Sequence, residues 1–305
     1  TWPDAWIPAA PPVAALALGL LGALLVFAPR GAPLRALGLA CVLPLFVPRD
    51  AGVRGPFELT VLDVGQGLSA IVETRHHVLV FDAGPAFEDG FDAGTAVVVP
   101  ALLARGHRHV DRLVLSHADL DHAGGVPGVR SRLDIRDELG TPGHPACADG
   151  QAWEWDGVRF EVLHPHGRGA SENDDSCVLR VSSATFSALL AGDIERGAEA
   201  RLLRDHRDRL QADVLVAPHH GSLTSSSPAF VAAVRPSVVV FAAAWRSRFG
   251  HPRAEVVQRY AEVGARPLTT GVEGAIRLHR DAAGAIRTES WRRLHPRYWN
   301  AAPEP

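Results

Sequence analysis

The stretch of the chain that points most directly to chemistry holds four potential metal ligands within six residues. His117, Asp119, Asp121 and His122 lie in the run SHADLDHAGG, directly after an apolar segment that begins at Val110. Carboxylates packed this closely repel one another unless a cation offsets their charge. The alternative is a solvated acidic turn in which the aspartates cap a helix. We interpret the run as part of a metal site.

Further candidate ligands stand at the ends of other predicted strands. An aspartate at such a position is by itself typical of a turn or a helix cap, and a single histidine is usually an ordinary polar group. Their repetition at strand ends predicts that one sheet edge gathers them around metal ions. These candidates are Asp82 in FDAG, Asp174 or Asp175 in NDDS, Asp193 in AGDIE, and His219 or His220 in PHHGS.

Composition narrows the chemistry further. The chain has 305 residues, and all 31 of its basic residues are arginine. The absence of lysine excludes Schiff-base and pyridoxal chemistry and a P-loop of the GxxxxGK[ST] type. The three cysteines, Cys41, Cys147 and Cys177, form no CxxC motif, and their spacing predicts no disulfide framework. Metal ligands must therefore come from carboxylates and from the 15 histidines.

The elements that position these residues follow a mixed α/β pattern from about residue 57. The order of strands and helices favours two sheets with helices outside them over one doubly wound sheet. Strands are predicted at 57–64, 69–73, 77–82, 110–116, 157–163, 176–182, 186–191, 212–217 and 237–242, and helices at 96–105, 197–210, 228–234 and 253–263.

The first fifty residues have a different character. The run from Ile7 to Pro29 carries no charge, and at 1.5 Å per residue a helix of that length spans a hydrocarbon core of about 30 Å. A second uncharged run, Ala36 to Pro48, is shorter and is predicted either as a tilted span or as a helix on the membrane surface. The alternative for both is a buried core helix. The chain contains no Met, so it has lost its initiator or is a piece of a longer polypeptide.

Six runs of the sequence resemble the metallo-β-lactamase superfamily and, more narrowly, the C-terminal domain of ComEC-type DNA-internalisation competence proteins. The resemblance implies an α/β fold of the αβ/βα four-layer sandwich type, preceded by one or two transmembrane helices. The expected parts are 1–50 in or on the membrane, a hydrolase domain at 51–280 and a basic, aromatic-containing tail at 281–305. The matching runs are Leu62–Gly67, Phe81–Gly84, Ser116–Gly125, Ala191–Glu195, Pro218–Ser222 and Phe249–Pro252.

The same resemblance implies a site for two metal ions. The third ligand of the first metal has no counterpart in this chain; Asp174 or Asp175 is the candidate, with His164 or His166 as the fallback. The other implied ligands are His117 and Asp119 for the first metal, Asp121, His122 and one of His219 or His220 for the second, and Asp193 between the two.

Three carboxylates receive catalytic roles on this interpretation. Asp193 holds the metal pair and accepts a proton from the nucleophile, Asp121 acts beside it, and Asp82 orients a ligand histidine. Asp119 stands where many members of the superfamily have histidine. A hard oxygen ligand at that position favours Mn²⁺, with Mg²⁺ and Zn²⁺ as alternatives.

The expected function is a metal-dependent nuclease domain of a DNA-uptake channel in the inner (plasma) membrane, which degrades one DNA strand during natural transformation. Its expected partners are DNA, the membrane and other segments of the channel. Arg246, Arg248 and Arg253 could contact the DNA backbone, and Trp291, Tyr298 and Trp299 could stack on bases. The alternatives are a hydrolase of small esters or amides and a metal-binding domain without catalysis.

Overall fold

The computed structural model describes residues 13–28, 34–46, 52–88, 90–165 and 171–296. The chain divides into two compact units, each described here by itself. One unit comprises Thr1–Gly52 and Pro100–Arg108, and the other comprises Val53–Val99 and His109–Pro305.

Within the first unit two short apolar helices pack together. They are α1 (Val13–Val26) and α2 (Arg35–Val42), the latter followed by the 3₁₀ turn η1 (Leu43–Leu45). Glycine permits this packing, because a Cβ atom on Gly22 would lie 2.6 Å from the carbonyl oxygen of Gly38. The large side chains of α1 face outward, with Leu20 66% and Leu24 64% exposed.

No helix among the described residues is both long and apolar enough to cross a membrane. The sequence predicts a span from Ile7 to Pro29, whereas α1 covers 14 residues of that run. Residues 7–12 and 29 lie outside the described part of the chain, as do 47 and 48 of the second predicted run.

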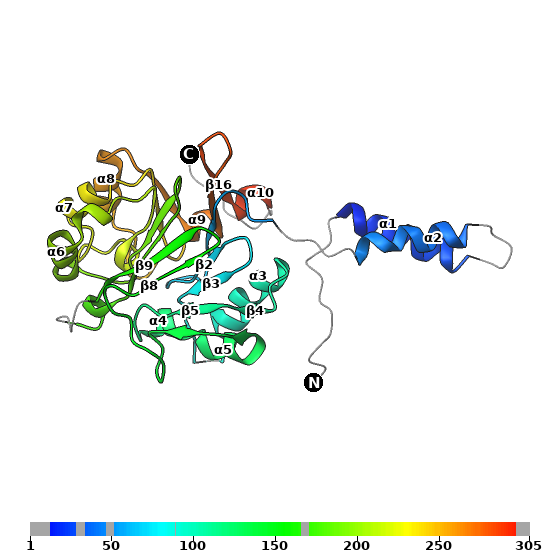
Figure 1. The fold of residues 1–305 in the computed structure, drawn as a ribbon, viewed down its shortest axis with the longest axis horizontal. Helices are drawn as coiled ribbons and strands as arrows, with labels where there is room; N and C mark the ends of the chain where they lie inside the picture. Colours follow the sequence, from blue (N-terminus) through cyan, green and yellow to red (C-terminus); the bar gives the residue numbers. More distant parts are fainter. Residues whose placement is uncertain (1–12, 29–33, 47–51, 89, 166–170, 297–305) are drawn as a thin grey trace. The chain divides into compact units, whose positions relative to one another are not determined.

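A seven-stranded sheet forms the first half of the second unit (Figure 1). Its order is β16-β15-β1-β2-β3-β5-β7, antiparallel from β16 to β3 and parallel from β3 to β7. Its strands are β1 (Glu58–Val61), β2 (Ala70–Glu73), β3 (Val78–Phe81), β5 (Arg112–Val114), β7 (Glu138–Leu139), β15 (Ile276–Arg280) and β16 (Ile286–Ser290).

A second seven-stranded sheet has the order β14-β13-β12-β11-β10-β9-β8, parallel from β14 to β11 and antiparallel from β11 to β8. Its strands are β8 (Ala152–Trp155), β9 (Val158–His164), β10 (Val178–Ser182), β11 (Ser187–Leu190), β12 (Val214–Val216), β13 (Val238–Phe241) and β14 (Arg266–Thr269). A small parallel pair, β4 (His109–Val110) and β6 (Asp134–Ile135), stands apart from both sheets.

The two sheets face each other across one hydrophobic core. Alternate side chains of both sheets, such as Phe81 and Val114 on one and Phe160 and Leu190 on the other, belong to the same buried cluster. Strands that are covered on both faces have nearly continuous apolar sequences, so each sheet can contribute side chains to a shared core. The predicted two-sheet architecture is confirmed.

Helices cover the outer faces. A second apolar cluster joins the outer face of the β8–β14 sheet to α6 (Arg196–Asp205), α7 (Pro228–Val234) and α8 (Ala254–Glu262). Figure 1 shows these helices on one side of the sheets and α4 (Leu120–Ala123) and α5 (Val126–Arg132) on the other. The remaining elements are η2 (Gly94–Val98), α3 (Val99–Ala104), η3 (Asn173–Asp175), η4 (Arg207–Arg209), η5 (Pro218–Gly221), α9 (Thr270–Glu273) and α10 (Trp291–Leu294).

One expectation about this unit is wrong, because Cys147 and Cys177 form a disulfide, although they lie 30 residues apart and outside any CxxC motif. Part of the segment expected as a basic, aromatic-containing tail supplies the edge strand β16 and the helix α10. In α10, the guanidinium of Arg292 pairs with the carboxylate of Asp63 at 2.6 Å.

Candidate metal centre

The candidate ligands follow the carboxyl ends of four strands that form two parallel pairs. Asp82 comes directly after β3, and the SHADLDH run comes just after β5, its parallel neighbour. Asp193 follows β11, and the PHHGS segment follows β12, again its parallel neighbour. Parallel strands end at the same sheet edge, so the topology brings these segments together.

Four of the predicted ligands form a compact group. Asp121, His122, Asp193 and His220 each offer one ligand atom, and these atoms lie within 4.8 Å of one another. Nε2 of His220 lies 3.2 Å from a carboxylate oxygen of Asp121 and 3.4 Å from one of Asp193. Nε2 of His122 lies 3.1 Å from the other oxygen of Asp193. We call these residues the Asp/His group.

Asp82 fixes the orientation of His122. Nδ1 of His122 donates a hydrogen bond to Oδ2 of Asp82 at 2.7 Å, and both side chains are fully buried. Asp82 is held in turn by the amide and the hydroxyl of Ser116, each at 2.7 Å. A histidine that donates through Nδ1 presents the lone pair of Nε2 to its other neighbours. Asp82 stays a predicted orienting residue, and its contact with His122 is the geometry that this role requires.

His117 and Asp119 lie beside the Asp/His group. The rings of His117 and His122 are 4.2 Å apart between centroids, and Nε2 of His117 lies 3.4 Å from Oδ2 of Asp119. Nδ1 of His117 lies 2.9 Å from the hydroxyl of Ser116, which itself donates to Asp82. Because the Ser116 hydroxyl donates its hydrogen to Asp82, it accepts from Nδ1 of His117. Nε2 of His117, on the side of Asp119, is then the unprotonated acceptor nitrogen.

Two buried polar atoms of the predicted metal ligands have no hydrogen-bond partner among the described residues. They are Oδ1 of Asp193 and Nε2 of His117. The contact of this Asp193 oxygen with His122 is close but lacks hydrogen-bond geometry. Buried polar atoms are almost always satisfied, so the orphaned pair fits a cation that these atoms would bind. Imidazole nitrogens with carboxylate oxygens suit a divalent transition metal.

Electrostatics in the absence of metal show how strongly the charges interact. Burial alone lowers the pKa of His220, but the carboxylates of Asp193 and Asp121 outweigh it and raise that pKa to about 9. Burial also lowers the pKa of His122, but Asp193 and Asp82 outweigh it and hold that pKa well above its usual range. Burial raises the pKa of Asp193, yet these two histidines hold it well below the ordinary value.

A comparison with known families agrees with this geometry. A family model described as "Metallo-beta-lactamase superfamily" matches residues 62–242, which include every member of the Asp/His group. The chain belongs to the metallo-β-lactamase superfamily.

Several curated relatives are ComEC-type proteins. The chain is 36% identical over 301 residues to "Competence protein ComA" of Neisseria gonorrhoeae, a match that covers 97% of this chain and 42% of the relative. It is 30% identical over 231 residues to "Recombination protein 2" of Haemophilus influenzae, covering 73% of this chain and 29% of the relative. The chain therefore spans less than half the length of these relatives.

A solved structure shows the same fold at low sequence identity. The "CmlA beta-hydroxylase E377D mutant" is 12% identical, with a TM-score of 0.50, and the match covers 85% of this chain and 62% of that one. This likeness concerns the fold alone.

The structure brings some of the predicted metal ligands into the Asp/His group and leaves others beside it. Of the two adjacent histidines, the structure brings His220 into the Asp/His group and leaves His219 at its rim. Nε2 of His219 lies 3.8 Å from Asp193, and its Nδ1 contacts Thr224 and Glu195. His219 and Asp119 stay predicted ligands, at the margin of the group.

The structure does not bring Asp174 to the group. Its Oδ1 accepts hydrogen bonds from the amides of Glu195 and Ala198, at the first turn of α6, and its other oxygen lies 3.5 Å from Arg201. A carboxylate engaged in this way caps a helix. His164, one of the two alternative candidates, is also engaged in a hydrogen bond, because its Nε2 donates to the carbonyl of Asp174 at 2.7 Å.

His166, the other fallback, lies outside the described residues. Ser176, which follows the NDD run, is buried beside the site: its hydroxyl lies 3.3 Å from Nδ1 of His117 and accepts from the amide of Asp193. Sequence reasoning missed both Ser116 and Ser176, because a serine beside a strand carries no signal of its own. Their position next to His117 and the NDD run was the one available clue.

Backbone geometry fixes His220 at the site. His219 and His220 have φ values of 49° and 54°, in the left-handed region that non-glycine residues rarely adopt. A similar constraint explains Gly67 in DVGQG, because a Cβ atom there would lie 2.2 Å from the carbonyl oxygen of Asp121. The loop after β1 can therefore press directly against the segment that carries Asp121.

Proposed function

We propose that this protein is a metal-dependent phosphodiesterase that cleaves DNA as part of a DNA-uptake system. The observation that carries the proposal is the Asp/His group, buried except for the half-buried Asp121, with its orphaned carboxylate oxygen at the edge where two parallel strand pairs end. The names of the relatives, which refer to competence and recombination, support DNA as the substrate.

The Asp/His group would hold the cations, with His117 and Asp119 as neighbouring ligands. Divalent cations at such a site supply Lewis acidity, which offsets phosphate charge and activates water for in-line attack. Asp82 keeps Nε2 of His122 directed toward the group, and Asp193, placed between His122 and His220, can take up the proton released by the attacking water. The oxygen of Asp119 favours Mn²⁺ over Zn²⁺.

The test is a substrate panel with the full chain. We expect cleavage of single-stranded DNA with Mn²⁺, less with Mg²⁺ or Zn²⁺, none with chelator, and no turnover of β-lactams or lactones. Asp193→Asn should lower cleavage by at least a hundredfold. Turnover of lactams or lactones without DNA cleavage would instead identify a small-molecule hydrolase. Metal binding without any turnover would identify a domain with a structural role.

We also propose that the protein is attached to the inner membrane and forms part of a channel with other chain segments. The exposed leucines of α1 and α2 support attachment to lipid, because apolar side chains of this density are usually covered. The rest of the relatives' length is where further channel segments would be encoded.

The disulfide supports a position for the catalytic unit on the oxidising side of that membrane. Reducing cytosol keeps thiols free, so a Cys147–Cys177 bridge would persist outside it. Alkylation of intact cells before reduction tests this. We expect one reactive thiol, Cys41, of the three cysteines. Labelling of all three cysteines would place the unit in the cytosol.

A further inference from the structure

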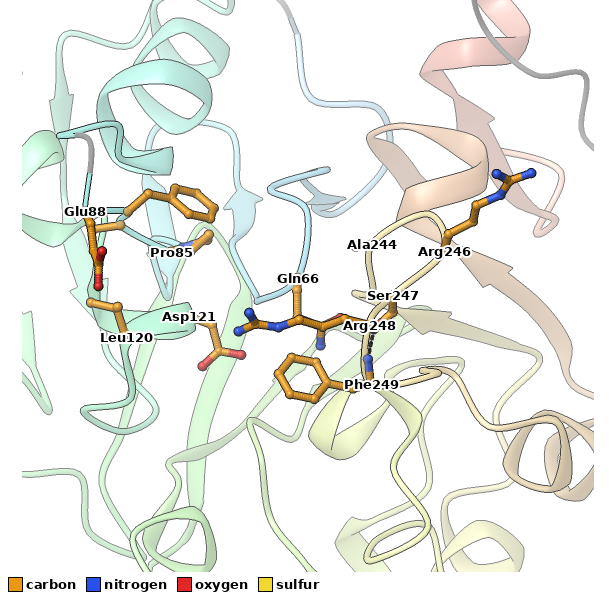
Figure 2. A pocket seen from close by; sticks show the side chains of 12 residues that line it. Gln66, Pro85, Glu88, Leu120, Asp121, Ala244, Arg246, Ser247, Arg248 and Phe249 are labelled. Carbon is orange, nitrogen blue, oxygen red and sulfur yellow. Dashed lines mark hydrogen bonds between the residues drawn. The ribbon is translucent and has the colours of Figure 1, made fainter.

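A groove opens directly beside the Asp/His group. Its volume is about 790 Å³, and Asp121 belongs both to its wall and to the group. The other walls come from the loop after β3, the start of α4 and the loop 244–249 after β13 (Figure 2). This volume lies in the range of sites that enclose an organic ligand of several rings.

Exposed aromatic rings and arginines line this groove. Phe87 on one loop is 52% exposed and Phe249 on another is 46% exposed. The guanidinium of Arg248 lies 4.7 Å from the centroid of the Phe249 ring. In Figure 2 the side chain of Arg248 extends toward Asp121, whereas that of Arg246 points away from it.

The loop 244–249, which carries Arg248 and Phe249, is held in place by hydrogen bonds. The hydroxyl of Ser247 donates to the side-chain oxygen of Gln66 at 2.8 Å and accepts from the amide of Phe249 at 3.3 Å. Gln66 belongs to the DVGQG loop, whose Gly67 presses against Asp121. The loop that carries Arg248 and Phe249 is therefore tied to the loop that lies against the carbonyl of Asp121.

We propose that this groove binds unpaired nucleotides next to the scissile phosphate, with Phe249 and Phe87 stacking on bases and Arg248 contacting a backbone phosphate. This rests on the proposed function and names the residues that would bind its single-stranded DNA substrate. Aromatic rings stack on any exposed base, whereas bases in a duplex are already stacked and paired. The guanidinium of Arg248, which extends toward the Asp/His group (Figure 2), would bind the phosphate next to the cleaved bond.

Binding can be tested without turnover by fluorescence anisotropy of labelled oligonucleotides with the full chain in chelator. We expect an oligothymidine strand to bind at least tenfold more tightly than a duplex or an abasic strand of equal length. Phe249→Ala should weaken oligothymidine binding about tenfold and leave abasic binding unchanged. Arg248→Gln should weaken both and reduce the dependence of binding on salt.

Trp245→Ala is the matched control. Trp245 is 51% exposed on the same loop but does not line the groove, so its loss should change binding less than twofold. Equal affinity for duplex and single strand, or unchanged oligothymidine binding in both Phe249→Ala and Phe87→Ala, would overturn the groove proposal.

A small phosphodiester, bis(p-nitrophenyl) phosphate, separates this proposal from the proposed function. Metal-dependent cleavage of that ester with unaltered oligonucleotide binding in the variants would retain the phosphodiesterase and reject the groove. Base-dependent binding without cleavage of any phosphodiester would retain the groove and reject the phosphodiesterase.

Discussion

Asp193 combines features that no other described carboxylate of the site shares. It is 3% exposed, lies between His122 and His220, and has one oxygen without a hydrogen-bond partner. An isolated buried charge is costly, and the two histidines offset it when no cation is bound. Its position at a strand end in GDIE made it a candidate in the sequence, whereas its contacts with both histidines required the fold.

We predict that Asp193→Ala lowers the metal content of the purified protein from about two ions to one or none, because it removes the oxygen between the ligand pairs. Elemental analysis measures this directly. Asp174→Ala is the control: it removes a cap of α6, should cost about 1 kcal/mol of stability, and should leave the metal content unchanged. Full metal content in Asp193→Ala would refute the ligand role.

His220 gives the metal-free protein a defined pH dependence. Its pKa is raised to about 9 in the folded chain, so folding is favoured by its protonation below pH 6.5, and this stabilisation is lost as the pH rises through 9. We predict a loss of at most about 3 kcal/mol over that interval, measured by urea unfolding in chelator. His220→Gln should flatten this part of the profile; a wild-type profile already flat in chelator would contradict the assigned contacts.

At the scale of elements, the parallel pairs β3–β5 and β11–β12 explain why the sequence predicted so much of the site. Buried apolar strands ending in polar residues are visible in the sequence, and their shared edge follows from topology. Residues that depend on loop packing were not visible. In the sequence Asp174 is a candidate ligand, but in the fold its Oδ1 accepts hydrogen bonds from amides at the first turn of α6.

The disulfide belongs to the same scale, since it joins the loop at Cys147 to the residue that precedes β10. Closing a loop of about 30 residues restricts the unfolded chain and stabilises the fold by about 3 to 4 kcal/mol in the chain-entropy model. We predict that the double variant Cys147→Ser, Cys177→Ser loses stability of this order in chemical denaturation. Identical denaturation midpoints for the variant and the oxidised wild type, or two free thiols by mass spectrometry, would contradict the bridge.

For the whole molecule, the two units differ in what they expose. The apolar residues of α1 and α2 remain largely exposed, whereas the second unit buries most of its apolar side chains in two clusters. The sequence indicated this division by an uncharged run but could not give helix ends, because uniform apolarity carries no capping signal. Ile286–Ser290, within the segment expected as a tail, alternates only weakly in polarity and gains its order by pairing with β15.

We predict that the full chain floats with phospholipid vesicles and that Leu20→Asp, Leu24→Asp reduces the floating fraction at least fivefold. Each substitution places a charge where an apolar side chain would contact lipid. Leu294→Asp, a substitution at a leucine 58% exposed in α10, should float as the wild type does. Equal flotation of the α1 variant and the wild type would show that these leucines do not contact lipid.

The central claim, that the Asp/His group holds the catalytic cations, is tested most directly by anomalous diffraction from crystals of the protein grown with Mn²⁺. We predict anomalous density within coordination distance of Asp121, His122, Asp193 and His220, with a second peak toward His117 and Asp119. Mn²⁺ density elsewhere, or none at this group in crystals that cleave DNA when dissolved, would contradict it.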